Sequence, residues 1–122
     1  MIELSDYGPL YTETNFDQWP VEPFNTFSNL LFLLVAINWA QRIKKQKNQN
    51  FKTFLKISLP LLLVGFVGGT VYHATRSHFG WMLMDVVPIY IIGVFTGVYH
   101  WRMLGCSFWL IIGIFVGLFA VP

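Results

Sequence analysis

The chain has 122 residues, of which 55% are hydrophobic and 11% charged, and its net charge is +2. A soluble domain carries about 25% charged residues, because it has a large surface to keep in contact with water. The composition therefore excludes an ordinary soluble domain, the small net charge argues against a nucleic-acid-binding protein, and the single cysteine excludes an internal disulfide.

Four apolar runs follow an acidic N-terminal segment, residues 1–23, and the sequence predicts an α-helix in each run. A helix needs about 20 residues to cross the hydrocarbon core of a bilayer, and each run is near that length. A strand is disfavoured because these runs lack the alternation of a barrel strand. We therefore expect one all-α integral membrane domain, residues 1–122, with about four transmembrane helices. The predicted helices cover approximately residues 24–42, 53–74, 80–101 and 103–122.

The basic residues predict which side of the membrane each loop faces. No lysine or arginine occurs from Met1 to Gln41, whereas the loop between the first two runs is strongly basic. Loops rich in lysine and arginine stay in the cytoplasm, so we expect a multi-pass protein with its N-terminus outside. The basic residues of this loop are Arg42, Lys44, Lys45, Lys47 and Lys52, with Lys56 just inside the second run.

His73 and Asp85 are ionisable residues within the apolar runs, where a charge is costly. His73 ends the second run and Asp85 lies about one turn inside the third. The loop between these helices is short, so a hairpin is predicted in which the two side chains lie at similar depth. They can then share a metal ion, or one can orient a ligand of the other. The alternatives are an interfacial histidine and an aspartate paired with Arg76.

A polar stripe runs into the first helix. Spacings of three and four residues place its members on one helical face, and this face must point into the helix bundle because lipid does not tolerate it. For Ser28 and Asn29, interhelical hydrogen bonding is the favoured role. The stripe consists of Glu22, Asn25, Ser28 and Asn29.

Oxygen-bearing side chains also gather just upstream, at Glu13, Asn15 and Asp17. Carboxylates and an amide without basic neighbours suit a hard cation such as calcium, and a solvated acidic loop explains them equally well. The groups that fall together on the predicted outer side are Glu13, Glu22, His73 and Asp85.

Four segments between Tyr11 and Tyr90 form a recognisable series: YTETN, EPFNTFSNLLFLL, GGTVYHATR and MDVVPI. In order and spacing they resemble the alkaline ceramidase family and its bacterial ceramidase-like members. That family belongs to a wider group of seven-helix membrane hydrolases that includes the adiponectin receptors. The resemblance implies the first four helices of a seven-helix bundle, located in a bacterial inner membrane.

The resemblance also implies a zinc-dependent hydrolase that cleaves the amide bond of ceramide or a similar N-acyl lipid in sphingolipid metabolism. It implies that His73 binds zinc together with a histidine pair from a late helix, and that Asp85 helps to position the attacking water. Glu13, Asn15 and Glu22 match the side chains of a calcium site beside the zinc. The implied partners are the lipid substrate and the bilayer.

The chain departs from the family pattern in two places. The family serine four residues before the zinc histidine is Gly69 here, so we expect the adjacent Thr70 to supply the hydroxyl. The late H-x-x-x-H pair does not occur, and the last apolar run reaches Pro122 without a polar flank. We therefore expect the front part of a longer protein, inactive alone. The alternatives are a non-catalytic receptor-like or assembly protein of the same fold, and a small ion carrier using Asp85 and Glu22.

Overall fold

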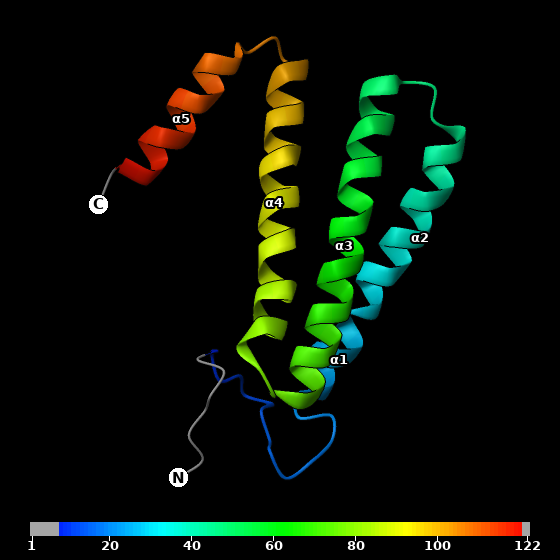
Figure 1. The fold of residues 1–122 in the computed structure, drawn as a ribbon, viewed down its shortest axis with the longest axis vertical. Helices are drawn as coiled ribbons and strands as arrows, with labels where there is room; N and C mark the ends of the chain where they lie inside the picture. Colours follow the sequence, from blue (N-terminus) through cyan, green and yellow to red (C-terminus); the bar gives the residue numbers. More distant parts are fainter. Residues whose placement is uncertain (1–7, 121–122) are drawn as a thin grey trace. The chain divides into compact units, whose positions relative to one another are not determined.

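In the computed structural model, which describes residues 8–120, all regular secondary structure is α-helical. The helices are α1 (Pro23–Ser28), α2 (Leu30–Lys45), α3 (Gln49–Thr75), α4 (Phe79–Met103) and α5 (Phe108–Ala120), as Figure 1 shows. The all-helical prediction is confirmed for this range. The predicted helix 24–42 is divided at Asn29 into α1 and α2, and α5 begins later than predicted because a turn follows α4.

The described residues form two separate units, divided between Ile92 and Gly93. In the first unit, α2 and α3 are neighbouring antiparallel helices, and α1 packs against α3 (Figure 1). Helix α3 begins at a cap: the Asn48 side chain accepts a hydrogen bond of 3.1 Å from the Phe51 amide, which would otherwise lack an intrahelical partner. At 27 residues α3 is about 40 Å long, so it separates two chemically different ends of the unit.

The part of α4 that belongs to the first unit lies close to α3, because three positions of α3 are glycines. A Cβ atom at Gly68 would lie 2.5 Å from Cβ of Met84 and 2.6 Å from its carbonyl carbon. At Gly65 it would lie 3.2 Å from the Ile89 side chain, and at Gly69 it would meet the Asp85 carboxylate. Small residues allow this approach of two backbones, as is typical of helix pairs in membranes.

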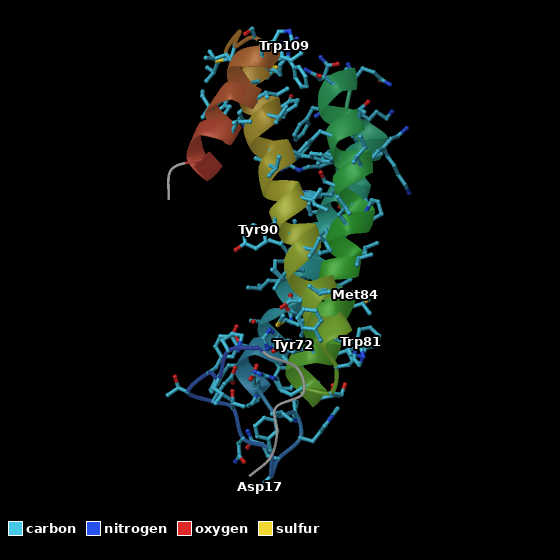
Figure 2. All side chains as sticks on the ribbon, turned by 60° about the vertical axis from the view of Figure 1, so that its left-hand side comes forward. Asp17, Tyr72, Trp81, Met84, Tyr90 and Trp109 are labelled. Atoms are coloured by element: carbon cyan, nitrogen blue, oxygen red, sulfur yellow. The ribbon has the colours of Figure 1, made fainter. Side chains whose placement is uncertain are left out.

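The described part of the N-terminal segment, residues 8–22, covers the end of α3. Figure 1 places this segment beside the turn between α3 and α4, remote from the connection between α2 and α3. Tyr72, one of the most buried side chains of the chain, lies at this end of α3 (Figure 2). Helix α3 stops where Arg76 takes a left-handed conformation, with φ 48° and its amide bonded to the Tyr72 carbonyl.

The second unit contains the last part of α4 and α5. Gly105, with φ 83°, ends α4 in the left-handed region that glycine adopts without strain. The amide of Gly105 bonds to the Arg102 carbonyl and that of Cys106 to the Trp101 carbonyl. This pairing closes the C-terminal turn of α4 in a Schellman arrangement and allows a second helix to start at Phe108.

Within the described range, α3 and α4 are long and apolar enough to cross a membrane by length and composition. Helix α2 has 16 residues and α5 has 13, which is less than the span of about 20 residues that a perpendicular crossing needs.

Candidate active site

The centre of the candidate site is Glu22, whose side chain is completely buried. Backbone pairing with the last turn of α3 fixes its position: the Val21 amide donates to the Ala74 carbonyl at 3.1 Å, and the Glu22 amide donates to the His73 carbonyl at 3.0 Å. The final carbonyls of a helix have no intrahelical donor, so an extended segment can dock there without losing hydrogen bonds. Docking brings a carboxylate from residue 22 to the end of α3.

Three side chains surround the Glu22 carboxylate. Its Oε1 accepts hydrogen bonds from the Thr14 hydroxyl and from Nη1 of Arg76, both at 2.6 Å, and its Oε2 lies 2.5 Å from Nδ1 of His73. Burial by itself disfavours the charged carboxylate, but the hydrogen bonds from Thr14, His73 and Arg76 outweigh burial and lower the pKa of Glu22 below its ordinary value. The ionised form is therefore the one that the fold stabilises.

His73 links Glu22 to Asp85. While Nδ1 faces Glu22, Nε2 lies 3.4 Å from Oδ2 of Asp85. The rings of Tyr11 and Tyr72 contact the imidazole edgewise, with centroids 5.7 Å and 5.1 Å away. A carboxylate on one ring nitrogen fixes the orientation of the imidazole and increases the basicity of the other nitrogen, which is how metal-binding histidines are usually held.

Asp85 reaches this site through a gap that Gly69 leaves in α3. A Cβ atom at position 69 would lie 2.5 Å from Oδ1 of Asp85 and 2.9 Å from Nδ2 of Asn29. Gly69 therefore admits the Asp85 carboxylate between the helices. The family resemblance, which places a serine at this position, did not suggest this role. The hydroxyl of Thr70 instead donates to the Phe66 carbonyl of its own helix at 2.7 Å, so its catalytic role stays a prediction.

Arg76 is the site residue that sequence reasoning placed differently. The sequence allows Arg76 to pair with Asp85, whereas in the structure its fully buried guanidinium bonds to Glu22. It also donates to the Pro9 carbonyl at 2.7 Å and to the Gly8 carbonyl at 3.3 Å, and it lies 4.8 Å from the centroid of the Tyr72 ring. One signal was available in the sequence: Arg76 is the single lysine or arginine on the acidic side of the two apolar helices.

The three residues expected to bind calcium are held by other donors. Glu13 accepts from the amides of Phe24 and Asn25 at 2.6 Å and 2.8 Å, which caps the start of α1. Oδ1 of Asn15 accepts from the Asp17 amide at 3.0 Å, and Glu22 is bonded as described above. Each of these oxygens keeps a further lone pair, so calcium binding by Glu13, Asn15 and Glu22 stays a prediction, and calcium carries no step in the function proposed below.

The predicted polar stripe divides into two environments. Ser28 is exposed and its hydroxyl donates to the Asn25 carbonyl at 2.9 Å. Asn29 is 5% exposed and lies against Gly69 beside the Asp85 carboxylate. Within the described part of the chain, its Nδ2 has no hydrogen-bond partner. Asn29 thus belongs to the site, whereas Ser28 lies on the surface.

The lowered pKa of Glu22 predicts that acid destabilises the fold. The stabilisation by the ionised carboxylate is complete above its ordinary pKa of 4.5 and is lost as the pH falls through the lower, folded-state value. As the pH falls below 4.5, we expect the free energy of unfolding in detergent to decrease in the wild type. In Glu22→Gln it should decrease less steeply. Equal pH dependence of the two proteins would contradict the assignment of the carboxylate as the acid-sensitive group.

The geometry fits one part of a zinc site. His73 is oriented by Glu22, and its Nε2 faces a second carboxylate, Asp85, so these two side chains are the ones that would hold the metal. Among the described residues, no group of three or more histidine, cysteine, aspartate and glutamate side chains is arranged to bind a metal ion. A structural or catalytic zinc site needs at least three protein ligands. His73 and Asp85 would therefore need a further ligand from elsewhere.

The chain was compared with known proteins at three levels. No protein-family model, no curated protein and no solved structure matches it. The function of the protein is therefore inferred from its residues and their geometry.

Proposed function

We propose that this protein is a multi-pass membrane protein with its acidic N-terminal segment on the outer side. Helices α3 and α4 supply two spans by length and composition, and α1–α2 and α5 are the other two proposed crossings. Large apolar side chains are exposed along α2, α3 and α4, including Leu34 at 61%; Tyr90 projects from α4 at 72% exposure (Figure 2). Exposed apolar surface on this scale is characteristic of contact with lipid or with another protein.

The charge distribution supports the orientation. Helix α3 carries the carboxylate-rich N-terminal segment at one end and the basic connection from α2 at the other. Under the positive-inside rule the basic end faces the cytoplasm, and a bacterial inner membrane is the proposed location. The candidate site then lies at the outer end of α3, where polar side chains and water meet the hydrocarbon.

We further propose that the site belongs to a zinc-dependent hydrolase of the amide bond of ceramide or a similar N-acyl lipid. The observation that carries this proposal is an imidazole held between two carboxylates, Glu22 and Asp85, at one end of an apolar helix pair. When bound, zinc supplies a water of lowered pKa and polarises the amide carbonyl. Glu22 orients the His73 ring, and Asp85 is the group placed to hold or accept a proton next to Nε2.

The surroundings of the site suit an amphipathic substrate. Asp85 lies within the second turn of α4, and Val86 and Val87, which follow it, are exposed by 39% and 45%. A lipid could therefore keep its acyl chain in the hydrocarbon while its amide reached the carboxylate. A ceramide-like lipid has this combination of a polar amide and long apolar chains.

A second function is favoured by a specific observation. Every oxygen of Glu22 is already bonded within the chain, and the positive charge next to it is Arg76. Attachment of the N-terminal segment to α3 is a sufficient role for this hydrogen-bond network, because its members satisfy one another. The second candidate is thus a non-catalytic receptor-like or assembly protein of the same fold.

Zinc content distinguishes the two candidates. We expect the purified protein in detergent to take up added zinc, and His73→Ala to take up less, because no other side chain at the site supplies a neutral nitrogen ligand. With two ligands from the described residues, the zinc affinity should be lower than that of a three-ligand site. His78→Ala is the matched control, since His78 is exposed and accepts from the Gly80 amide. Far-ultraviolet circular dichroism confirms that each variant is folded. Equal uptake of added zinc by the wild type and His73→Ala would contradict the hydrolase and favour the second candidate.

A further inference from the structure

The end of the α2–α3 hairpin opposite the candidate site is strongly basic. Six of the eight lysines and arginines of the chain lie there, and residues 42–56 contain no aspartate or glutamate. Among the described residues, none of the six forms an ion pair with a carboxylate, since the ion pairs involve Glu22, His73, Arg76 and Asp85. The positive charge at this end is therefore not neutralised within the described structure. The six residues are Arg42, Lys44, Lys45, Lys47, Lys52 and Lys56.

A polar hollow of about 210 Å³ lies at the C-terminal end of α2, lined by Asn38, Gln41, Arg42, Lys45 and Gln46. Two hydrogen bonds orient its walls. Nε of Arg42 donates to Oδ1 of Asn38 at 2.9 Å, and Oε1 of Gln46 accepts from the Asn48 amide at 3.0 Å. Because these amide oxygens accept bonds from the protein, their NH₂ groups remain as donors. The hollow thus presents two cations and several N–H donors, which is the chemistry that binds a phosphate.

An apolar groove of about 450 Å³ adjoins this polar hollow. The two share Asn38 and Arg42, and the groove continues along α2 toward the middle of the helix. Trp39 lies at the boundary, with its ring centroid 6.2 Å from that of Phe54, as amphipathic rings do at the edge of a bilayer. The other residues that line the groove are Leu34, Val35, Trp39 and Phe51.

We propose that the polar hollow and the apolar groove together form a binding site for one anionic phospholipid. Arg42 and Lys45 bind the headgroup phosphate, the amides of Asn38 and Gln46 donate to its remaining oxygens, and an acyl chain lies along Leu34 and Val35. The continuity of the two cavities favours a lipid over a soluble phosphate, because a soluble anion would leave the groove unused. The proposal depends on the membrane placement of the protein and is independent of the hydrolase.

Lipid titration of the whole chain in detergent, followed by native mass spectrometry, tests this site. The probes are dioleoyl phosphatidylglycerol, which is anionic, and dioleoyl phosphatidylcholine, which is zwitterionic. Two double variants remove the same charge: Arg42→Gln/Lys45→Gln changes the hollow, and Lys52→Gln/Lys56→Gln changes basic residues outside it. We expect the wild type to prefer phosphatidylglycerol and the first variant to bind it about 30-fold more weakly, as expected for two basic contacts to an anionic headgroup. The second variant should keep most of the affinity.

Each other outcome contradicts the proposal. Equal loss in the two double variants would mean that total surface charge, and not the hollow, attracts the lipid. Undiminished affinity in Arg42→Gln/Lys45→Gln would exclude these side chains as headgroup ligands. Inorganic phosphate or glycerol 3-phosphate that displaced the lipid at equal concentration would exclude a role for the groove. Circular dichroism of both variants verifies that they keep the helical content of the wild type.

Discussion

Replacing Arg76 with alanine is expected to destabilise the folded chain by about 3–5 kcal/mol, because it leaves the Glu22 carboxylate buried without its guanidinium partner. The loss has three structural components. The ion pair with Glu22 disappears, the carbonyls of Pro9 and Gly8 lose their donor, and the N-terminal segment is no longer attached to the end of α3. The free energy of unfolding by denaturant in a mild detergent measures the change.

A charge-matched control separates this network from net charge. Arg102→Ala also removes one positive charge, but Arg102 is exposed and makes one bond of 3.3 Å to the Cys106 carbonyl, so we expect less than about 0.5 kcal/mol. The double variant Arg76→Ala/Glu22→Gln should recover part of the lost stability, since it removes the uncompensated charge. A loss for Arg76→Ala no larger than that for Arg102→Ala would contradict a buried, stabilising ion pair.

Introducing a single methyl group at Gly68 is expected to destabilise the helix pair by about 1–3 kcal/mol. The new Cβ atom of Gly68→Ala would lie 2.5 Å from Cβ of Met84 and 2.7 Å from the backbone nitrogen of Asp85, so the two helices must move apart. Backbone atoms cannot change rotamer to relieve the overlap. Because the displaced segment includes Asp85, we also expect Gly68→Ala to weaken zinc binding if His73 and Asp85 hold the metal.

The glycines of the second unit supply the opposite control. A Cβ atom at Gly97 would have no neighbour within 4 Å, so Gly97→Ala adds helix propensity without a clash. We expect no loss for Gly97→Ala, and a gain of about 0.5–1 kcal/mol. Thermal and denaturant unfolding of the two alanine variants in the same detergent compares them directly. If both variants changed stability in the same direction, close packing at Gly68 would not be the reason for its glycine.

The sequence alone determined the helical architecture and the two chemically different ends of the chain. Long apolar runs without strand alternation can satisfy their backbone only as helices, and the charges are separated along the sequence itself, with the acids and His73 at one end and the lysines at the other. The pairing of His73 and Asp85 was also predictable, because a short turn connects their helices and forces the two side chains to similar depth. These conclusions depend on local pattern and short separations in sequence.

Only the tertiary structure decided which charges meet. Glu22 and Arg76 are 54 residues apart, and their contact requires the N-terminal segment to dock on the carbonyls that end α3. Sequence pattern could not predict that docking, because it depends on hydrogen-bond groups that exist only once the helix has formed. For the same reason the sequence could not predict that Glu13 caps α1. The role of Gly69 became visible only when the Asp85 carboxylate occupied the space that a side chain there would fill.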